Sequence, residues 1–574
     1  MEKLGVVAKK LNTTERMISG LLRIVSITSN PDKYYDTVDC VGGWVKTMRK
    51  QNNDQLIFIA LSDGSSPNNL QVVVQNNMPN FADLLNQNVA ACLRVRGKLV
   101  RSPKEGQAIE LLVDDPELHS VEVLGANLDV KNYPLGGKKR HTLEHLRKYL
   151  HLRPKTNFTA SMSRVRNALA MATHQFYQEL GFMYVHTPII TTSDCEGAGE
   201  MFEVKANIIE EVEVSKKDKK KKKAEGDKTK GKDADKPKAE QGEQKTGDAA
   251  QEKVEEKTQE QKVDEKQAEE KVQEQKPAEA QQQQTPQGPQ TRVKDFFDKK
   301  ASLTVSGQLA VENYACALTN VYTFGPTFRA ENSHTSRHLA EFWMIEPEIC
   351  FAGMEELFQL IEGYIKFCID YCFENVPDDL EYFNKMFKEN KKEAEGFDDL
   401  LEYLKKLSKS QFHRMSYTEA IEYLTDVTKS KKAKFKTKVE WGIDLGSEHE
   451  RYICEQHFKA PVFLYNYPQK IKAFYMRVND DNKTVACTDL LLPFIGEVAG
   501  GSVREERLDV LEQSIRNFGL LPEDYQYYCD LRKYGTVPHG GFGVGFERLV
   551  MLVTGIENIR DAIPFPRYPG HCDC

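Results

Sequence analysis

The chain contains 574 residues, of which 40 % are hydrophobic and 29 % are charged, and its net charge is -7. That length is too great for one hydrophobic core, so we expect two or three globular domains. The slight acidic excess excludes an overall basic coat for nucleic acid, and the lack of any run of about 18 apolar residues excludes a membrane-spanning helix.

The first part of the chain predicts an N-terminal extension, residues 1–34, followed by a small β-barrel over residues 35–125. Between 37 and 125, short β-runs recur about every ten residues, and turn signals such as Asp63-Gly64 separate them. This spacing is typical of a closed barrel.

Residues 126–155 lose the strand alternation and predict a hinge, because Gly136-Gly137 precedes the basic helical run KKRHTLEHLRK. After the hinge we expect a mixed α/β domain over residues 156–574. It begins with a helix near 161–180, whose apolar residues recur at helical spacing.

An insertion at 212–293 interrupts this domain. Residues 215–290 contain no Leu, Ile, Phe, Trp, Tyr or Met, so the segment cannot bury enough apolar surface to offset its ordering entropy. We therefore expect it to be disordered. It can serve as a solvated spacer, or its lysine-rich first third can act as a polybasic arm with non-specific RNA affinity.

Two features of the composition bear on cellular location. Twelve cysteines are scattered without paired metal spacing, which fits free thiols in a reducing compartment. Glu2 and Glu15 favour an N-terminal helix docked on the protein over a transit peptide, which would avoid acidic residues. We expect a cytoplasmic protein.

The stretch FRAENSHTSRHLAEFWMIEPE, residues 328–348, concentrates opposed charges beside aromatic rings. It predicts two antiparallel strands joined by the polar turn ENSHTS, with Arg329, Glu331, Arg337 and Glu341 on one face of the hairpin. Guanidinium groups beside an exposed ring suit a nucleotide. The alternative is a surface hairpin with many salt bridges and its aromatic residues in a core.

A second stretch, HGGFGVGFERLVMLVTG at 539–555, carries glycines at alternate positions. A dinucleotide fold is disfavoured because no crossover unit follows. We expect Gly541, Gly543 and Gly545 to remove side chains so that a ligand can lie against a strand, with Arg548 opening the next helix beside that ligand.

Three stretches carry a resemblance to a known family. FRAE...RHLAEF and GFGVGFERL resemble motifs 2 and 3 of class II aminoacyl-tRNA synthetases, and GFMYVHTPIITTSDCEGAGEMF resembles motif 1 continuing into the amino-acid loop. The barrel opening VGGWV and the run HTLEHLRKYLHLRP resemble the aspartyl, asparaginyl and lysyl branch. Within that branch, WGIDLGSEHERY and GEVAGGSVREER match the asparaginyl enzymes.

The resemblance implies an α+β protein: an N-terminal OB-fold barrel that binds the anticodon, then a class II synthetase domain built on an antiparallel β-sheet flanked by helices. The implied activity is ligation of L-asparagine to its tRNA, with anticodon GUU, using ATP and Mg²⁺ through an asparaginyl-adenylate. Motif 1 implies a homodimer. The alternatives are an aspartyl-tRNA synthetase and a non-catalytic, synthetase-like RNA-binding paralogue.

The same resemblance implies roles for residues around ATP. Arg329 and Arg548 would be the catalytic residues, Arg329 holding the α-phosphate and the attacked carboxylate. Arg337 would grip the outer phosphates together with Arg548. Glu331 would accept from the adenine amino group, and Phe342 would stack on adenine. Such a site clamps charge and positions the reactants without a covalent nucleophile.

The metal and amino-acid positions follow in the same way. Asp489 and Glu497 would hold Mg²⁺ on the phosphates, although Asp489 lies one residue farther upstream than in aspartyl enzymes. Glu196, Ser306 and Gln308 match the loop that closes on the α-amino group. Arg504 matches the arginine that pairs with the substrate's α-carboxylate or side chain.

The preference for asparagine is inferred from charge. Aspartyl enzymes typically carry a lysine in the run SPQLxKQ, whereas Val311 occupies that position here and Glu312 follows it. Glu312 would accept from a carboxamide NH₂ group and repel a carboxylate. The alternative is that Glu312 faces another partner, such as an arginine.

In the barrel, the resemblance implies that Phe58 stacks on the anticodon and that Gln71 hydrogen-bonds it. An exposed aromatic residue on an OB surface is a suitable platform for a splayed RNA base. A single Phe in an alternating strand is otherwise more often a core residue. The basic hinge is expected to face RNA phosphates.

Overall fold

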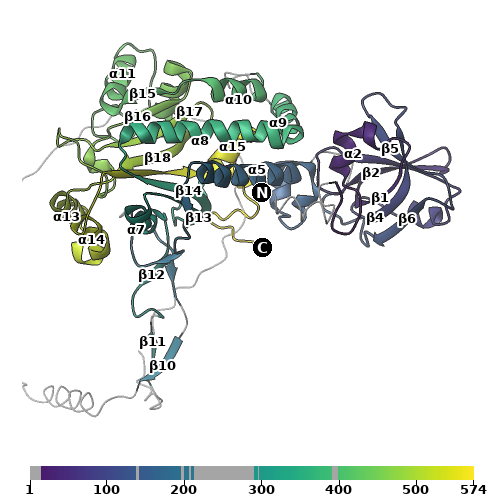
Figure 1. Cartoon of the computed structure of the whole chain (residues 1–574), viewed down its shortest axis with the longest axis horizontal. Coiled ribbons are helices and arrows are strands. Elements are labelled where there is room, and N and C mark those ends of the chain that lie inside the picture. Colours follow the sequence, from purple (N-terminus) through teal and green to yellow (C-terminus); the bar gives the residue numbers. More distant parts are fainter. Residues whose placement is uncertain are drawn as a thin grey trace, which may run out of the picture. The chain divides into compact units, whose positions relative to one another are not determined.

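The computed structural model describes residues 15–136, 141–195, 200–205, 208–212, 290–294, 296–390 and 398–574. The chain divides into two compact units, one made of Met1–Val204 and Lys300–Cys574 and the other of Lys205–Lys299. Figure 1 follows the chain by colour. Among the described residues, no helix combines the length and the apolar character needed to cross a membrane.

The predicted β-barrel is confirmed. Its sheet has the order β1-β2-β3-β5-β4-β6, and because β1 also pairs with β4, the strands β1 to β5 close on themselves. The short helix α3 (Phe81–Leu85) precedes β4. The strands are β1 (Val38–Gln51), β2 (Leu56–Ser62), β3 (Leu70–Gln75), β4 (Cys92–Arg101), β5 (Ile109–Val113) and β6 (Ser120–Gly125).

The period-two pattern of the barrel strands explains its core. In β2, Ile57 and Ile59 are buried inside the barrel and Phe58 between them is half-buried on the outer side. The predicted N-terminal extension also contributes to this core, because Ile24 and Ile27 of α2 (Ile24–Ser29) are buried among the barrel residues.

The second unit contains two described strands, β10 (Ile208–Val212) and β11 (Gln290–Lys294), which pair antiparallel. The predicted insertion therefore needs corrected bounds, since Val212 and residues 290–293 belong to a hydrogen-bonded ladder. The rest of the predicted disordered segment lies outside the described residues.

An eight-stranded sheet forms the centre of the larger domain, in the order β15-β16-β17-β18-β19-β14-β13-β7. Its inner pairings are antiparallel, as predicted, and the two edge pairings, β15–β16 and β13–β7, are parallel. The strands are β7 (Met183–Tyr184), β13 (Asn320–Phe328), β14 (Glu341–Cys350), β15 (His413–Ser416), β16 (Val462–Tyr465), β17 (Cys487–Leu492), β18 (Gly496–Val503) and β19 (His539–Gly545).

A small sheet, β8 (Ile190–Thr191), β12 (Ala301–Leu303) and β9 (Glu203–Val204), accompanies it. The predicted helix near 161–180 is confirmed as α5, where the Thr156 side chain caps the first turn by accepting from the backbone N–H of Thr159. The longer helices are α5 (Asn157–Glu179), α7 (Gln308–Leu318), α8 (Met354–Asn375), α9 (Pro377–Asn390), α10 (Leu400–Lys409), α11 (Tyr417–Lys429), α13 (Leu508–Asn517), α14 (Gln526–Lys533) and α15 (Phe546–Thr554). Two short helices are α4 (Leu143–Arg147), in the predicted hinge, and α12 (Ser447–Arg451).

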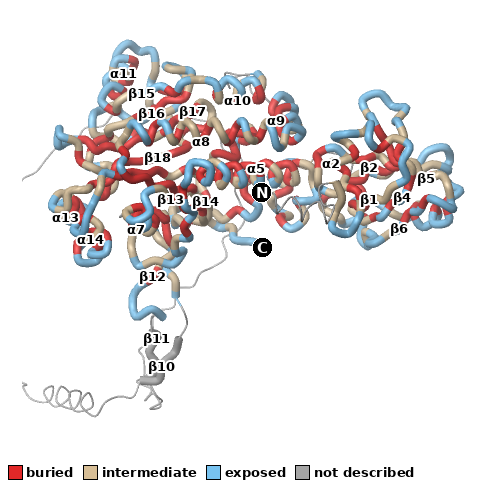
Figure 2. Tube along the Cα trace, viewed as in Figure 1, coloured by how far each residue is buried: buried red, intermediate tan, exposed pale blue. Residues whose placement is uncertain are grey.

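The two faces of the sheet differ in polarity, and the alternating residues of β14 show this difference. Ile345 and Ile349 point to the face that α8 and α15 cover, where they join the main hydrophobic core. Glu346 and Glu348 alternate with them and therefore point to the opposite face. Figure 2 shows the buried residues concentrated along β18 and α8. One face packs the core and leaves the other free for chemistry.

Candidate active site

A cavity of about 460 Å³ lies on the polar face of the sheet, bounded by β14, β17, β18 and β19. Glu312 does not line it, Glu196 lies outside the described residues, and Phe58 and Gln71 belong to the barrel. The residues predicted from the sequence that do line it are Ser306, Gln308, Arg329, Glu331, Arg337, Phe342, Asp489, Glu497, Arg504 and Arg548.

The predicted hairpin exists, but its connection is longer than expected. β13 and β14 pair from Asn320 with Ile349 to Phe328 with Glu341. The prediction that Arg329, Glu331 and Arg337 lie in strands is wrong, since residues 329–340 form a loop. Arg329 N still donates to Ala340 O across the hairpin at 3.0 Å, whereas Ala330 N donates to Glu200 O at 2.8 Å, outside the hairpin.

Arginines gather at one end of the cavity. The Arg329 guanidinium lies 5.5 Å from the centroid of the Phe342 ring. Arg548, on the first turn of α15, donates to the backbone carbonyl of Glu497 and lies 3.4 Å from its Oε2. Burial and the nearby charges of Arg451 and Arg548 lower the pKa of Arg337. Cations placed this close together suit a polyanionic ligand.

Two carboxylates converge beside these arginines. Asp489 on β17 is paired with Gly500 on β18, and a β-bulge between Leu490 and Leu491 then brings Glu497 to the same place. A Cβ atom at Gly500 would lie 3.2 Å from Asp489 Oδ1 and 3.3 Å from Glu497 Oε1.

The pKa values of the two carboxylates are shifted in opposite directions. Burial raises the pKa of Asp489, and the charge of Glu497 adds to this effect, although Lys472 Nζ donates to Asp489 Oδ2 at 2.7 Å. Burial would also raise the pKa of Glu497, but the charges of Arg548 and Lys472 outweigh it and lower that pKa. The pair supplies hard oxygen ligands of the kind that Mg²⁺ prefers.

The glycines of β19 make room for side chains of the neighbouring strand as well as for a ligand. A Cβ atom on Gly541 would lie 2.0 Å from Glu348 Oε2, and one on Gly543 would lie 2.3 Å from Met344 Cε. Gly543 and Gly545 line the cavity, as predicted from the sequence, whereas the space at Gly541 is filled by Glu348.

A second group of polar atoms lies at the N-terminus of α7. Ser306 Oγ donates to Glu346 Oε1, and Gly307 N donates to Glu346 Oε2 at 2.9 Å. Gln308 is buried, and among the described residues its Nε2 has no hydrogen-bond partner. A carboxylate beside a buried, unsatisfied amide suits a ligand that carries both a cationic and an anionic group.

The deepest part of the cavity contains a bidentate ion pair. Arg504 Nε donates to Glu348 Oε1 at 2.8 Å and Arg504 Nη2 donates to Oε2 at 2.9 Å. Arg504 Nη1 also donates to Ser502 Oγ at 2.6 Å. Both charged residues line the cavity and are almost fully buried, so this end presents donors and acceptors whose charges already cancel.

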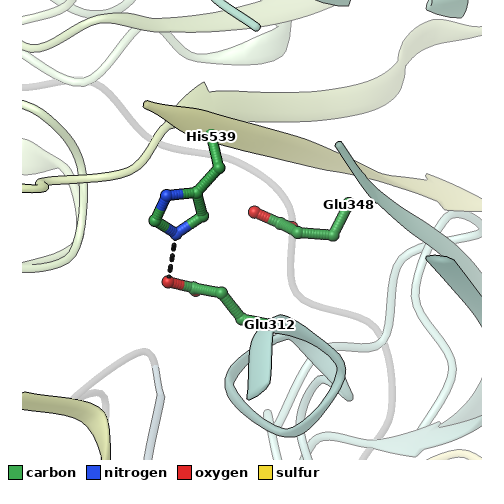
Figure 3. Close-up of side chains that lie close together, drawn as sticks. All are labelled: Glu312, Glu348 and His539. Atoms are coloured by element: carbon green, nitrogen blue, oxygen red, sulfur yellow. Dashed lines mark hydrogen bonds and ion pairs between the residues drawn. The ribbon is translucent and has the colours of Figure 1, made fainter. Parts of the chain in front are cut away.

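Glu312 lies behind this pair, in a buried cluster with Glu348 and His539 (Figure 3). Its Oε1 accepts from Arg532 Nη2 at 2.6 Å, and its Oε2 accepts from the hydroxyl of Tyr528 at 2.8 Å. This corresponds to the alternative interpretation, in which Glu312 faces an arginine. Because arginines already bind both carboxylates, we assign no metal to the cluster.

The two predicted anticodon residues share the outer face of the barrel. Ala60 pairs with Gln71 across β2 and β3, so the side chain of Gln71 lies on the same side as that of Phe58. Phe58 is half-buried, while its neighbours Ile57 and Ile59 fill the core. Gln71 Nε2 donates to Glu110 Oε2 at 3.2 Å.

The sequence interpretation missed Glu346, Glu348 and Lys472. The first two follow Phe342 at even spacing in FWMIEPE, and the strand period places them on the face of Phe342. That signal was present in the printed sequence. Lys472 lies in a loop before β17, and only its contact with Asp489 reveals it.

Comparison with known proteins agrees with this geometry. The family model "tRNA synthetases class II (D, K and N)" matches residues 142–215 and 249–569, and "OB-fold nucleic acid binding domain" matches residues 40–119. "Asparagine--tRNA ligase, cytoplasmic 3" of Arabidopsis thaliana is 49% identical over 93% of this chain and 91% of its own. The asparagine--tRNA ligase of Shewanella denitrificans is 44% identical over 96% and 99%.

Among solved structures, the chain resembles the asparaginyl-tRNA synthetase of Pyrococcus horikoshii complexed with asparaginyl-adenylate. The TM-score is 0.69 at 26% identity, and the match covers 96% of this chain and 98% of that one. The family model, the relatives and the fold agree over nearly the full length. The chain therefore belongs to the class II tRNA synthetases of the aspartyl, lysyl and asparaginyl group, among the asparagine--tRNA ligases.

Proposed function

We propose that this chain attaches L-asparagine to tRNA(Asn) in the cavity on the polar face of the sheet, with ATP as substrate and asparaginyl-adenylate as intermediate. The observation that carries the proposal is the division of the cavity into two ends. Arginines gather at one end, and the self-neutralised pair Glu348–Arg504 closes the other. A polyanion suits the first end, and a neutral, hydrogen-bonding side chain suits the second.

At the arginine end, ATP would lie against Phe342 with its phosphates facing Arg329, Arg337 and Arg548. Glu331 lines the same region and can accept from the adenine amino group. When the asparagine carboxylate attacks the α-phosphorus, negative charge shifts onto pyrophosphate. Guanidinium groups fixed before the reaction stabilise that charge without reorganising, which is why no covalent nucleophile is required.

At the other end, the substrate carboxamide would meet Glu348 and Arg504. A carboxamide offers NH₂ donors to a carboxylate and a carbonyl oxygen to a guanidinium, so both halves of the ion pair find a partner. The side chain of aspartate would add a second negative charge beside Glu348. We assign direct recognition of the amide to Glu348 and Arg504, with Glu312 supporting them from behind.

Between the two ends, the α-amino group would be held by the residues at the start of α7. Glu346 supplies the negative charge, and Ser306 fixes its orientation by donating to it. Gln308 offers a buried amide N–H for which the described residues supply no acceptor. Glu196, which lies outside the described residues, is proposed to complete this group from the loop of motif 1.

Mg²⁺ fits the site formed by Asp489 and Glu497, because their oxygen atoms converge on one point facing the cavity. These two residues would hold it, and when bound it would neutralise charge on the phosphates. Lys472 and Arg548 already balance part of the carboxylate charge and keep the two side chains in place.

Three further assignments complete the proposal. Phe58 and Gln71 would contact the anticodon on the barrel. Motif 1 would form a homodimer, which is supported by exposed apolar residues on and after α5, namely Met171, Leu180, Met183 and Tyr184. A cytoplasmic location is supported by the twelve cysteines, which are scattered through the sequence without paired metal spacing.

Pyrophosphate exchange driven by the amino acid tests the proposal directly. Exchange should depend on asparagine, should be much weaker with aspartate, and should be lost in Arg329→Ala. The matched control is Arg516→Ala, which removes an arginine of α13 that pairs with Glu512 away from the cavity. Equal exchange with the two amino acids, or full activity of Arg329→Ala, would overturn the assignment.

A further inference from the structure

A network of buried charges lies behind the amino-acid end of the cavity. Glu312 of α7 and His539 of β19 are both fully buried, and Glu348 is 1 % exposed. Nitrogen and oxygen atoms of these three side chains lie within 4.8 Å of one another. Figure 3 shows the imidazole ring reaching Glu312 while Glu348 lies beside both. Charges this close and this deep must compensate one another.

The hydrogen bonds of His539 determine its charge. Its Nδ1 lies 2.7 Å from the backbone carbonyl oxygen of Val537, and its Nε2 lies 2.7 Å from Glu312 Oε1. Carbonyl and carboxylate oxygens only accept, so each ring nitrogen must donate. A ring that donates from both nitrogens is an imidazolium cation.

The neighbours of His539 keep that charge in place. Burial alone would lower its pKa, but the charge and hydrogen bond of Glu312 and the charge of Glu348 outweigh burial and raise it. Glu312 is itself held ionised, because the charges of Arg532 and His539 lower its pKa against the effect of burial. The titratable and charged groups that interact with the ring are Glu312, Cys316, Glu348 and Arg532. Arg504 and Tyr528 lie one step farther away, where they bind Glu348 and Glu312.

Opposing effects act on the pKa of Glu348. Burial raises its pKa, Arg504 lowers it, Glu312 raises it and His539 lowers it, and the pKa remains above its ordinary value. Glu348 and Glu312 are like charges a few ångströms apart in a buried site. The His539 cation therefore adds to the effect of Arg504 in favouring the ionised form of Glu348.

We propose that His539 is a positioning residue that keeps Glu348 ionised and paired with Arg504, and that it thereby sets the preference for asparagine over aspartate. The inference rests on the proposed function, in which Glu348 and Arg504 meet the substrate side chain. Without the imidazolium, Glu348 takes up a proton and releases its hold on Arg504. The freed guanidinium then offers a bidentate site to the carboxylate of aspartate.

The test measures kcat/KM for asparagine and for aspartate in pyrophosphate exchange, with full-length wild-type protein and His539→Gln, over a range of pH. The asparagine-to-aspartate ratio should fall about tenfold or more in the variant. The acid limb of that ratio should also move to higher pH, because Glu348 becomes easier to protonate. An unchanged ratio and an unchanged pH profile would overturn the proposal.

A rescue variant separates charge from shape. In Glu312→Gln with His539→Gln, the anion that opposes Glu348 is removed together with the cation that favoured it, so the ratio should recover towards the wild-type value. Failure of the folded double variant to recover the ratio would overturn the proposed role of the imidazolium charge. His119→Gln, which replaces a buried histidine of the barrel bonded to the backbone of Asp114 and Asp115, is the matched control and should leave the ratio unchanged.

Glu348→Gln distinguishes failure of this inference from failure of the proposed function. It should lower the ratio and remove the acid limb. If it changes nothing, the assignment of the cavity is wrong. If it lowers the ratio while His539→Gln does not, only the role of His539 is wrong.

Should His539→Gln fail to fold, ¹⁵N NMR of the wild-type imidazole provides the decisive measurement. Both ring nitrogens of His539 should be protonated at neutral pH, and a neutral ring would overturn the proposal.

Discussion

The two ends of the active-site cavity hold their arginines in opposite ways. Arg548 is 29 % exposed in its side chain, and its nearest carboxylate oxygen, Glu497 Oε2, is 3.4 Å away. Arg504 is 3 % exposed and binds Glu348 through two short hydrogen bonds. In the first arrangement, the positive charge of the arginine remains available for a polyanion. In the second, Glu348 neutralises the positive charge, so only hydrogen-bonding capacity remains.

Because of this difference, we expect substitutions at the buried end to reduce mainly stability and substitutions at the exposed end to reduce mainly activity. A buried, fully paired cation cannot be removed without stranding its partner, whereas a loosely paired cation at the cavity mouth can be removed at little structural cost. Substitutions at the two ends should therefore have effects that different measurements detect.

The largest expected effect is on folding. Arg532→Met removes the buried partner of Glu312 and leaves that carboxylate without its main counter-charge. The free energy of unfolding should fall by about 3–5 kcal/mol, measured by urea denaturation. Arg414→Ala, which breaks an exposed pair with Glu355, is the control and should change stability by less than about 1 kcal/mol. Similar losses in the two variants would show that the buried pair contributes no more to stability than the exposed pair.

Arg548→Ala should have the opposite signature. Transition-state stabilisation in asparagine-dependent pyrophosphate exchange should fall by about 3 kcal/mol, roughly a hundredfold in kcat/KM for ATP. The urea midpoint should stay near that of the wild type. A large loss of stability with intact exchange would mean that Arg548 is a structural residue.

A third region, the outer face of the barrel, is expected to bind RNA by stacking. Phe58→Ala should weaken binding of tRNA(Asn) by about 1–3 kcal/mol and leave exchange unchanged, since exchange requires no tRNA. Filter binding at two salt concentrations would show an equal loss at both. Leu124→Ala, an exposed residue of β6, is the control. A loss of exchange activity in Phe58→Ala would place this residue in a structural role.

The smallest effect is expected for the metal. Asp489→Asn should raise the Mg²⁺ concentration needed for half-maximal exchange about tenfold, equivalent to ~1.4 kcal/mol. Glu512→Gln on α13, which pairs with Arg516 at the surface, should leave the requirement unchanged. An unaltered Mg²⁺ profile in Asp489→Asn would remove this residue from the metal site.

Local pattern was sufficient for much of this architecture. Alternation in LIFIALS predicted a barrel strand, helical spacing predicted α5, and the glycines before Arg548 predicted a strand that opens into a helix. These features depend on residues close in sequence, so the printed sequence contains the information that determines them.

What sequence interpretation could not supply depends on contacts between distant segments. Glu312 was expected to face the substrate, but Arg532, 220 residues later, supplies its partner. The bulge between Leu490 and Leu491 is likewise invisible until two strands are aligned. In the loop that contains Arg329, Ala330 N donates to the backbone carbonyl oxygen of Glu200. The sequence of the hairpin alone does not predict that contact.

The missing side chain at Gly541 has a consequence for engineering. Glu348 occupies the volume that any larger residue at that position would need. An alanine there would push the carboxylate away and would disturb, through it, the guanidinium of Arg504 that it binds. Attempts to retune this enzyme towards other amino acids should therefore keep residue 541 as it is and begin at Gly543, where the obstructing neighbour is a flexible methionine.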